Sequence, residues 1–276
     1  MRDGLRIASV CRNLPSPTNP SAGIFVQKRL EAMAAYADVH VLQPVPYFPF
    51  VRPLPDWVRA PPRLIGELRV EHVPMFYVPG VLKSMDSAWL AMSVERRIAQ
   101  MHSERRIDLI DAHFGFPEGT ACVAIGKRLR IPVLVTIRGF EQEFAGRRLV
   151  GQKLMDSLRL ANGVVAVSHS LESFAVDSGV PADRVRVIHN AVDPVMFQFG
   201  NRAEARRALG VEDERTLVVS VGHLVSVKRF HVLIDGFSRY VARNPGALLV
   251  IIGGPSFEPT YPVELHAQVR RLGLEG

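Results

Sequence analysis

The sequence predicts an α/β protein with mostly parallel sheets in two domains, and three observations lead to this fold class. Short apolar runs alternate with segments of helical period from Leu5 to Ile188. The alternation is interrupted between Asn190 and Asn201 and then resumes. Only two strand patterns follow the interruption. Because strand–helix alternation produces βαβ units, we expect a parallel sheet in each part of the chain.

The elements of the first part follow from hydrophobic spacing. Apolar residues at 26, 30, 33 and 34 lie on one face of a helix, and apolar residues at 90, 94, 98 and 101 also follow the helical period. Further helices are expected at 118–130, 147–161 and 170–178. Strands are expected at Leu5–Cys11, Val39–Gln43, Leu68–Val73, Leu109–His113, Val133–Ile137, Val164–Val167 and Val185–Ile188. Residues 44–62 carry seven prolines, which predicts a loop that cannot join a central strand.

The second part is expected to be an incomplete domain. Residues 1–190 form the predicted N-terminal domain, 191–201 a linker that contains Asp193-Pro194, and 202–276 a partial C-terminal domain. Its strands are expected at Leu217–Val221 and Ala247–Ile252, and its helices at 202–209, at 228–243 and from Leu265. Two strands and three helices can hardly cover their own apolar surface. Either the C-terminal domain is cut short or something else completes it.

Composition and charge narrow the function classes. Of 276 residues, 47% are hydrophobic and 22% charged, which is typical of a globular protein. No run is long enough for a membrane span or a secretory signal, and two cysteines, Cys11 and Cys122, are too few for a disulfide scaffold or a cysteine-built metal site. We therefore expect a cytoplasmic protein. The net charge of +7 favours anionic partners, although a solvated cationic surface explains it equally. The basic pairs are scattered and lack interleaved aromatics, so nucleic acid is not an expected partner.

Several familiar signatures are absent from the sequence. There is no G-x-G-x-x-G after the first strand, no Walker loop, no strand-end Asp-x-Asp pair for a metal–diphosphate and no G-x-S-x-G elbow. This argues against a dehydrogenase, a P-loop enzyme and an α/β hydrolase.

Chemically useful residues stand instead at the carboxyl ends of predicted strands, where open α/β sheets bind ligands. A glycine before the first helix can let backbone amides approach an anion, and a lysine before a later helix can neutralise a phosphate. Each residue also has an ordinary explanation: a turn, a core histidine, an exposed ion pair, a helix cap or a solvated lysine. The candidates are Gly23, His113, Arg138, Glu141, Ser168, Asn190, Asp193, His223 and Lys228.

Taken together, these segments resemble glycosyltransferase family 4, the retaining sugar-nucleotide transferases of the GT-B fold. The resemblance rests on SAGIFVQKRLEAM, on DLIDAHFGFPEG with VTIRGFE, on VVAVSHSL and VIHNAVD, and on VGHLVSVKRF with the strand end at 252–255. It implies two Rossmann-like domains, the first complete and on the acceptor side, the second binding the nucleotide sugar.

The resemblance also implies roles for individual residues. His113 would lie beside the transferred sugar as a catalytic residue, with Arg138-Gly139, Glu141 and Ser168 on the sugar and acceptor side. Gly23, His223 and Lys228 would hold the donor diphosphate, without a metal or a resident cofactor, and Asn190 and Asp193 would mark the domain joint. The expected reaction moves a sugar from a UDP- or GDP-sugar to an acceptor hydroxyl of a glycan, a lipid-linked glycan or a small molecule.

The sequence departs from the family pattern in its second part. His223 stands where the family often has Arg, Arg229 where it usually has Gly, and the paired-glutamate motif has no counterpart. We therefore expect a chain truncated in the C-terminal domain, and two alternatives stay open: a non-catalytic remnant, or one half of a split glycosyltransferase.

The proline-rich segment 44–62 leaves a further question open. Its aromatic residues and basic flanks fit a lipid-linked acceptor or a peripheral contact with an anionic membrane at its inner face. An ordinary packed loop explains the same residues equally well.

Overall fold

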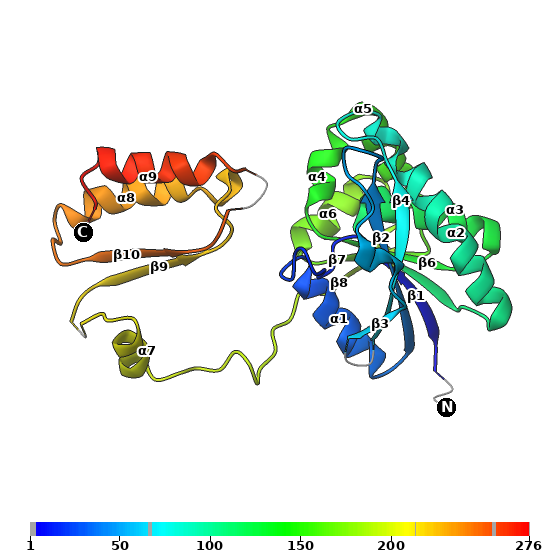
Figure 1. Cartoon of the computed structure of the whole chain (residues 1–276), viewed down its shortest axis with the longest axis horizontal. Helices are drawn as coiled ribbons and strands as arrows, with labels where there is room; N and C mark the ends of the chain where they lie inside the picture. Colours follow the sequence, from blue (N-terminus) through cyan, green and yellow to red (C-terminus); the bar gives the residue numbers. More distant parts are fainter. Residues whose placement is uncertain (1–3, 66–67, 213, 256–257, 276) are drawn as a thin grey trace. The chain divides into compact units, whose positions relative to one another are not determined.

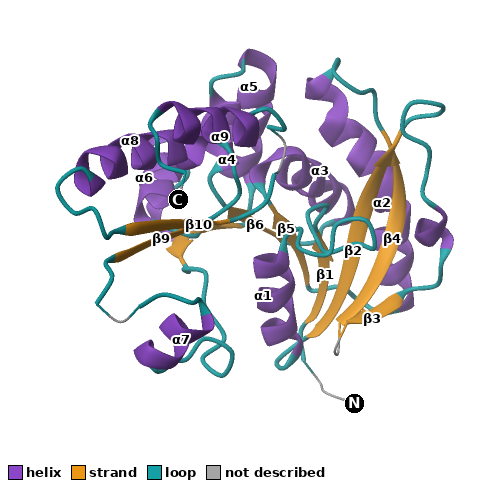
Figure 2. Ribbon diagram, turned by 60° about the vertical axis from the view of Figure 1, so that its left-hand side comes forward, coloured by secondary structure: helices purple, strands orange, loops and turns teal. Residues whose placement is uncertain are grey.

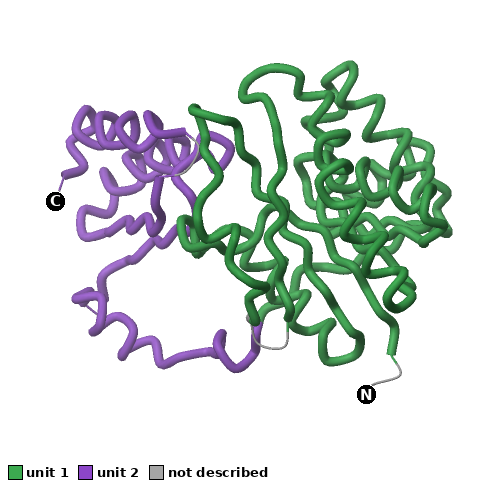
Figure 3. Tube along the Cα trace, turned by 45° about the vertical axis from the view of Figure 1, so that its right-hand side comes forward, with its two compact units in different colours: residues 1–192 green, residues 193–276 purple. Residues whose placement is uncertain are grey.

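The computed structural model describes residues 4–65, 68–212, 214–255 and 258–275. The chain divides into two compact units, residues 1–192 and residues 193–276 (Figure 3). We call them unit 1 and unit 2 and describe each by itself. Both are α/β in architecture, as the sequence predicts.

The described part of unit 1 is built on one sheet of eight strands in the order β3-β4-β2-β1-β5-β6-β7-β8 (Figures 1 and 2). All neighbours pair in parallel except β3 and β4, which are antiparallel. The strands are β1 (Arg6–Val10), β2 (Asp38–Tyr47), β3 (Arg63–Ile65), β4 (Leu68–Phe76), β5 (Leu109–His113), β6 (Val133–Ile137), β7 (Gly163–Ala166) and β8 (Val185–Val187). The sequence did not predict β3.

Helices cover both faces of this sheet. Side chains of β1 alternate between two apolar cores, with Ala8 and Val10 in the larger core and Ile7 in the smaller one. The helix α1 packs on the smaller core through Val26 and Leu30, and the other helices supply the larger core. The helices are α1 (Ile24–Ala34), α2 (Asp86–Glu104), α3 (Thr120–Leu129), α4 (Phe140–Ala145), α5 (Arg148–Leu160) and α6 (His169–Asp177).

The predicted loop at 44–62 is wrong in its first four residues, because β2 continues through Pro44 and Pro46 to Tyr47 and pairs with β4. The reason lies in the direction of the backbone groups. The carbonyl of Leu42 accepts from the amide of Cys11 just after β1, whereas the carbonyl of Tyr47 accepts from the amide of Tyr77 just after β4. The backbone N–H and C=O groups of even-numbered residues of β2 therefore point toward β1. Because β1 ends before it reaches Pro44 and Pro46, the N–H groups that these prolines lack would have had no partner on β1, and no hydrogen bond of the sheet is lost.

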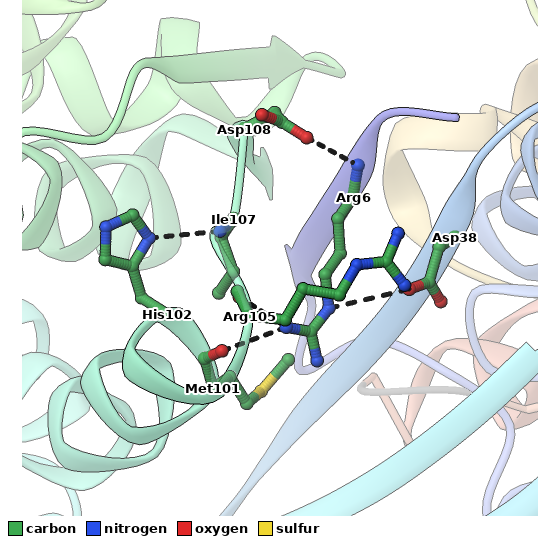
Figure 4. Close-up of polar contacts among 7 residues, drawn as sticks. All are labelled: Arg6, Asp38, Met101, His102, Arg105, Ile107 and Asp108. Atoms are coloured by element: carbon green, nitrogen blue, oxygen red, sulfur yellow. Dashed lines mark hydrogen bonds and ion pairs between the residues drawn. The ribbon is translucent and has the colours of Figure 1, made fainter. Parts of the chain in front are cut away.

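The amino edge of the sheet is fastened by polar contacts around Arg6 (Figure 4). The Arg6 amide donates to Asp108 at 2.9 Å, and its guanidinium donates to the carbonyl of Met101 at the end of α2 at 2.9 Å. The neighbouring Arg105 lies 3.2 Å from Asp38 at the start of β2. These contacts tie β1, β2 and the α2–β5 connection together at this edge.

The buried apolar core of unit 2 is small, and its two strands are only partly covered. It contains α7 (Arg202–Ala208), β9 (Leu217–Val221), α8 (Phe230–Val241), β10 (Leu248–Ile252) and α9 (Tyr261–Arg271). The two strands pair in parallel, and the buried cluster of Phe230, Ile234, Tyr261 and Leu265 lies between α8 and α9. The strands are only partly covered: Val221 is 72% exposed and Ile252 is 47% exposed. An open groove of about 710 Å³ runs along Leu249 and Ile251 of β10.

Candidate functional site

Arg138 is the point at which four segments of unit 1 meet. It follows β6, and its guanidinium donates to Asn190 Oδ1 at 2.9 Å and lies 3.3 Å from His113 Nδ1 at the end of β5. The same guanidinium stacks over the ring of Phe25, near the start of α1, at 5.1 Å from the centroid. Burial, together with the positive charge of Arg29, lowers the pKa of Arg138 to about 10. The structure therefore brings His113, Arg138 and Asn190 together beside the Gly23 loop.

His113 is fully buried, and its ring is oriented by two neighbours. Its Nε2 lies 2.9 Å from Asp111 Oδ2. Because a guanidinium can only donate, Nδ1 accepts from Arg138 and the ring proton lies on Nε2, facing the carboxylate. His113 is therefore held between the Asp111 carboxylate and the Arg138 guanidinium.

Asp111 is a site residue that the sequence reasoning missed. It is fully buried, and Ser9 Oγ donates to its Oδ2 at 3.3 Å. The available signal was its position two residues before His113 on one strand, since such residues point to the same face. Burial by itself would raise the pKa of Asp111, but the interaction with the His113 ring, together with the charge of Arg29 and the hydrogen bond from Ser9, holds it below its usual range.

Replacing Asp111 with asparagine is expected to lower the free energy of unfolding of unit 1 by about 2 kcal/mol at neutral pH. A carboxyl whose pKa is lowered by folding stabilises the native state above its ordinary pKa, and that stabilisation is lost as the pH falls through the folded value. The difference between the wild-type protein and Asp111→Asn should therefore shrink below about pH 4. Urea unfolding across this range measures it, with the exposed Asp177→Asn as control. A difference that does not change with pH would contradict the assignment.

Glu141 lies in the first turn of the helix α4, which the sequence did not predict, and its side chain points into unit 1. Its side chain is 1% exposed. Oε1 accepts from the amide of Gly115 at 2.8 Å, while Oε2 accepts from the amides of Arg138 at 3.0 Å and Gly139 at 2.7 Å. The carboxylate thus joins the loop after β5 to the loop after β6. Glu141 positions the Arg138-Gly139 segment, and its own oxygens are taken by backbone.

Gly23 occupies a position that no other residue can take without rearrangement. It is the N-cap of α1 with φ 57, and a Cβ built there would lie 1.6 Å from the carbonyl oxygen of Asn13. The close approach brings the start of an eleven-residue helix against the loop that follows β1. Helix starts carry backbone N–H groups that suit an anion.

Ser168, Asp193 and Asn190 each form a hydrogen bond, but their partners differ. Ser168 is the N-cap of α6 and accepts from the amide of Leu171 at 3.3 Å, which is the helix-cap interpretation. Asp193 Oδ1 accepts from the amide of Val195 at 2.9 Å and shapes a turn. Only Asn190 of the three contacts Arg138.

His223 and Lys228 belong to unit 2, where they lie at the carboxyl end of β9. Both side chains are exposed. A Cβ at Gly222 would touch the Lys228 side chain at 3.9 Å, and a Cβ at Gly253 would lie 1.8 Å from the carbonyl oxygen of Gly222. The backbones at the ends of β9 and β10 therefore lie in close contact, beside the exposed side chain of Lys228. Arg229, where the family pattern has glycine, adopts φ 55 at the start of α8.

Across residues 4–65, 68–212, 214–255 and 258–275, no group of three or more His, Cys, Asp or Glu side chains could hold a metal ion. Over the same residues, no helix is both long and apolar enough to cross a bilayer.

The comparison with family models decides the family. The model of Glycosyltransferase Family 4 matches residues 32–195, which is more than half of the chain. The chain belongs to glycosyltransferase family 4. His113, Arg138, Glu141 and Asn190 lie within the matched residues.

Two relatives of this family 4 chain are named as glycosyltransferases. A D-inositol 3-phosphate glycosyltransferase of Acidothermus cellulolyticus is 32% identical over 47% of the chain and 30% of its own length. TuaC of Bacillus subtilis, named for teichuronic acid biosynthesis, is 27% identical over 89% of the chain and 65% of its own length. The chain therefore spans less than two thirds of the length of these relatives.

A solved structure places the fold of this family 4 chain among GT-B proteins. HepE of Anabaena, solved with UDP and glucose, matches 99% of the chain and 67% of its own with a TM-score of 0.69 and 18% identity. The predicted Rossmann-like, GT-B-type fold class is confirmed, and with it the predicted family.

Proposed function

We propose that the protein is a retaining glycosyltransferase that moves a sugar from a UDP- or GDP-sugar to an acceptor hydroxyl. The observation that carries this proposal is that His113 and Asn190 both contact the guanidinium of Arg138, at the carboxyl ends of the strands of unit 1. Arg138 Nε is buried and has no hydrogen-bond partner among the described residues, so the hydrogen-bonding capacity of this guanidinium is not filled by unit 1. HepE, a protein of the same fold, binds UDP-glucose, which supports a nucleotide-sugar donor.

In this proposal the charges of the donor are met by protein groups, and no resident cofactor or metal takes part. Lys228 opposes the diphosphate with the start of α8, and Gly23 presents the start of α1. Arg138 contacts the sugar and is itself held by His113, which Asp111 orients. Glu141 holds the loops after β5 and β6 in place. Fixed cations and helix termini stabilise a leaving diphosphate because they need no reorganisation as its charge develops.

The acceptor in this proposal is a glycan, a lipid-linked glycan or a small molecule. The relatives named for inositol 3-phosphate and for teichuronic acid biosynthesis support an acceptor rich in hydroxyl groups. We place the reaction in the cytoplasm, because nucleotide sugars are the proposed donors.

A binding screen of UDP- and GDP-sugars by calorimetry tests this function. Lys228→Ala is expected to weaken binding of the preferred donor about a hundredfold, because it removes a charge-assisted contact to phosphate. Lys228→Arg should retain most of the affinity. The matched control is Arg243→Ala, which removes an exposed cation after the far end of α8.

Two outcomes would contradict the proposal: no binding to any nucleotide sugar, or equal affinity for the wild-type protein and Lys228→Ala. Binding without turnover on supplied acceptors would instead favour the alternatives of a non-catalytic remnant or one half of a split enzyme.

A further inference from the structure

Two short loops of unit 1 lie together at the ends of β2 and β4. They are residues 48–52 and 77–85, and we call them the paired loops. Both follow strands that run in parallel and end at the same edge of the sheet (Figure 2). The Tyr77 ring joins them, because Arg52 stacks over it at 5.8 Å and Lys83 at 5.3 Å. Arg52 also donates to the Tyr77 hydroxyl at 3.3 Å.

The residues at the ends of the paired loops are apolar and exposed. Phe50 is 101% exposed and Leu82 is 59% exposed. Both adopt a left-handed backbone, with φ 66 at Phe50 and φ 53 at Leu82, which is unfavourable for a residue with a side chain. Such a conformation persists only where the surroundings determine it. Val51 and Val81 beside them are exposed as well.

The bases of the paired loops are held firmly, so these side chains do not fold back. Phe48 and Arg52 exchange two backbone hydrogen bonds of 2.8 and 2.9 Å. The Phe48 ring lies 5.7 Å from Phe76, which lies 5.8 Å from Trp89 of α2. The carbonyl of Ser84 accepts from the ammonium group of Lys153. Apolar ends on fixed bases can enter an apolar phase without losing much conformational freedom.

The charges beside these ends have one sign. Residues 48–52 and 77–85 contain Arg52 and Lys83 and no Asp or Glu. Asp86, directly after the second loop, is buried and lies 3.7 Å from Lys83, whereas Asp56, four residues after Arg52, is exposed. Apolar ends with cations at their base match the order of layers in an anionic bilayer, in which phosphates lie above the acyl chains.

We propose that the paired loops dock on the surface of an anionic lipid bilayer, with Phe50 and Leu82 in the acyl boundary and Arg52 and Lys83 among the phosphates. Trp57, one of the aromatic residues of the segment 44–62, is not part of this surface. It is half-buried with its ring 4.9 Å from His72 of β4. The packed-loop interpretation thus holds for Trp57, while the exposed end at Phe50 carries the membrane contact.

Flotation with vesicles of equal parts phosphatidylglycerol and phosphatidylcholine tests this surface with the full chain. We expect the wild-type protein to bind these vesicles, and the double variant Phe50→Ser/Leu82→Ser to bind at least about tenfold more weakly. The matched control is Tyr36→Ser, which removes a side chain that is 85% exposed just before β2 begins, at the opposite edge of the sheet. It should bind as the wild-type protein does.

A second pair of variants tests the charges. Arg52→Gln/Lys83→Gln should lower the affinity for the anionic vesicles about tenfold. A Phe50→Trp variant should shift its emission to the blue when anionic vesicles are added.

Three outcomes would overturn the proposal. They are no binding to the anionic vesicles, undiminished binding by Phe50→Ser/Leu82→Ser, or light scattering that shows a dimer lost on Phe50→Ser, which would make the surface an interface between two copies of the chain. The assay contains no nucleotide sugar, so its failure leaves the proposed transferase function untouched. Lys228→Ala should bind vesicles as the wild-type protein does.

Discussion

Replacing Glu141 with alanine is expected to lower the free energy of unfolding of unit 1 by about 4 kcal/mol. The substitution removes the acceptors of three backbone amides, those of Gly115, Arg138 and Gly139. Amides left without a partner in a buried place each cost a desolvation penalty. Both tryptophans, Trp57 and Trp89, belong to unit 1, so tryptophan emission during urea unfolding measures the effect on this unit.

The same helix provides the control for Glu141. Glu143 is exposed and, in the part of the chain that the structure describes, forms an ion pair with Arg147 four residues later, so Glu143→Ala should change the free energy of unfolding by about 0.5 kcal/mol or less. Glu141→Gln keeps one acceptor oxygen and should fall between the two. Similar losses for Glu141→Ala and Glu143→Ala would show that the buried carboxylate does not hold the two loops.

Replacing Gly253 with alanine is expected to destabilise unit 2 by about 3 kcal/mol. The new Cβ would lie 1.8 Å from the carbonyl oxygen of Gly222, and a backbone atom cannot move aside as the end of a side chain can. The strand ends must separate, which breaks the hydrogen bonds from Gly222 to Ile252 and from Leu224 to Gly254, both 2.9 Å long. The small buried cluster between α8 and α9 offers little to compensate.

Hydrogen exchange of peptides that cover β9 and β10 measures this effect, because the tryptophans report on unit 1 alone. The neighbouring Gly254 is the control, since a Cβ built there meets nothing within 4 Å. Gly254→Ala should exchange as the wild-type protein does. If the proposed function holds, Gly253→Ala also loses donor binding, because Lys228 extends from the displaced loop. Equal exchange in the two alanine variants would refute the close-approach argument.

Hydrophobic periodicity along the chain was enough to locate most of the fold. The strands β5, β6 and β9 begin and end where the apolar runs do, and α2 buries the four positions that its spacing singled out. Periodicity succeeds because burial against a sheet is decided by the face on which each side chain points, which is a local property. The strand-end positions of His113 and Arg138 likewise predicted two residues that the structure brings into contact.

Tertiary structure alone decided what depends on a neighbouring segment. The prolines of β2 are harmless because β1 ends beside them, which nothing in residues 44–47 reveals. Glu141 was assigned to the ligand side, yet its carboxylate turns inward, because the amides that it accepts come from two loops that meet only in the folded sheet. Asp111 became visible as the partner of His113 through burial. Hydrogen-bond partners distant in sequence are set by strand order and register, and the pattern of single residues carries little information about either.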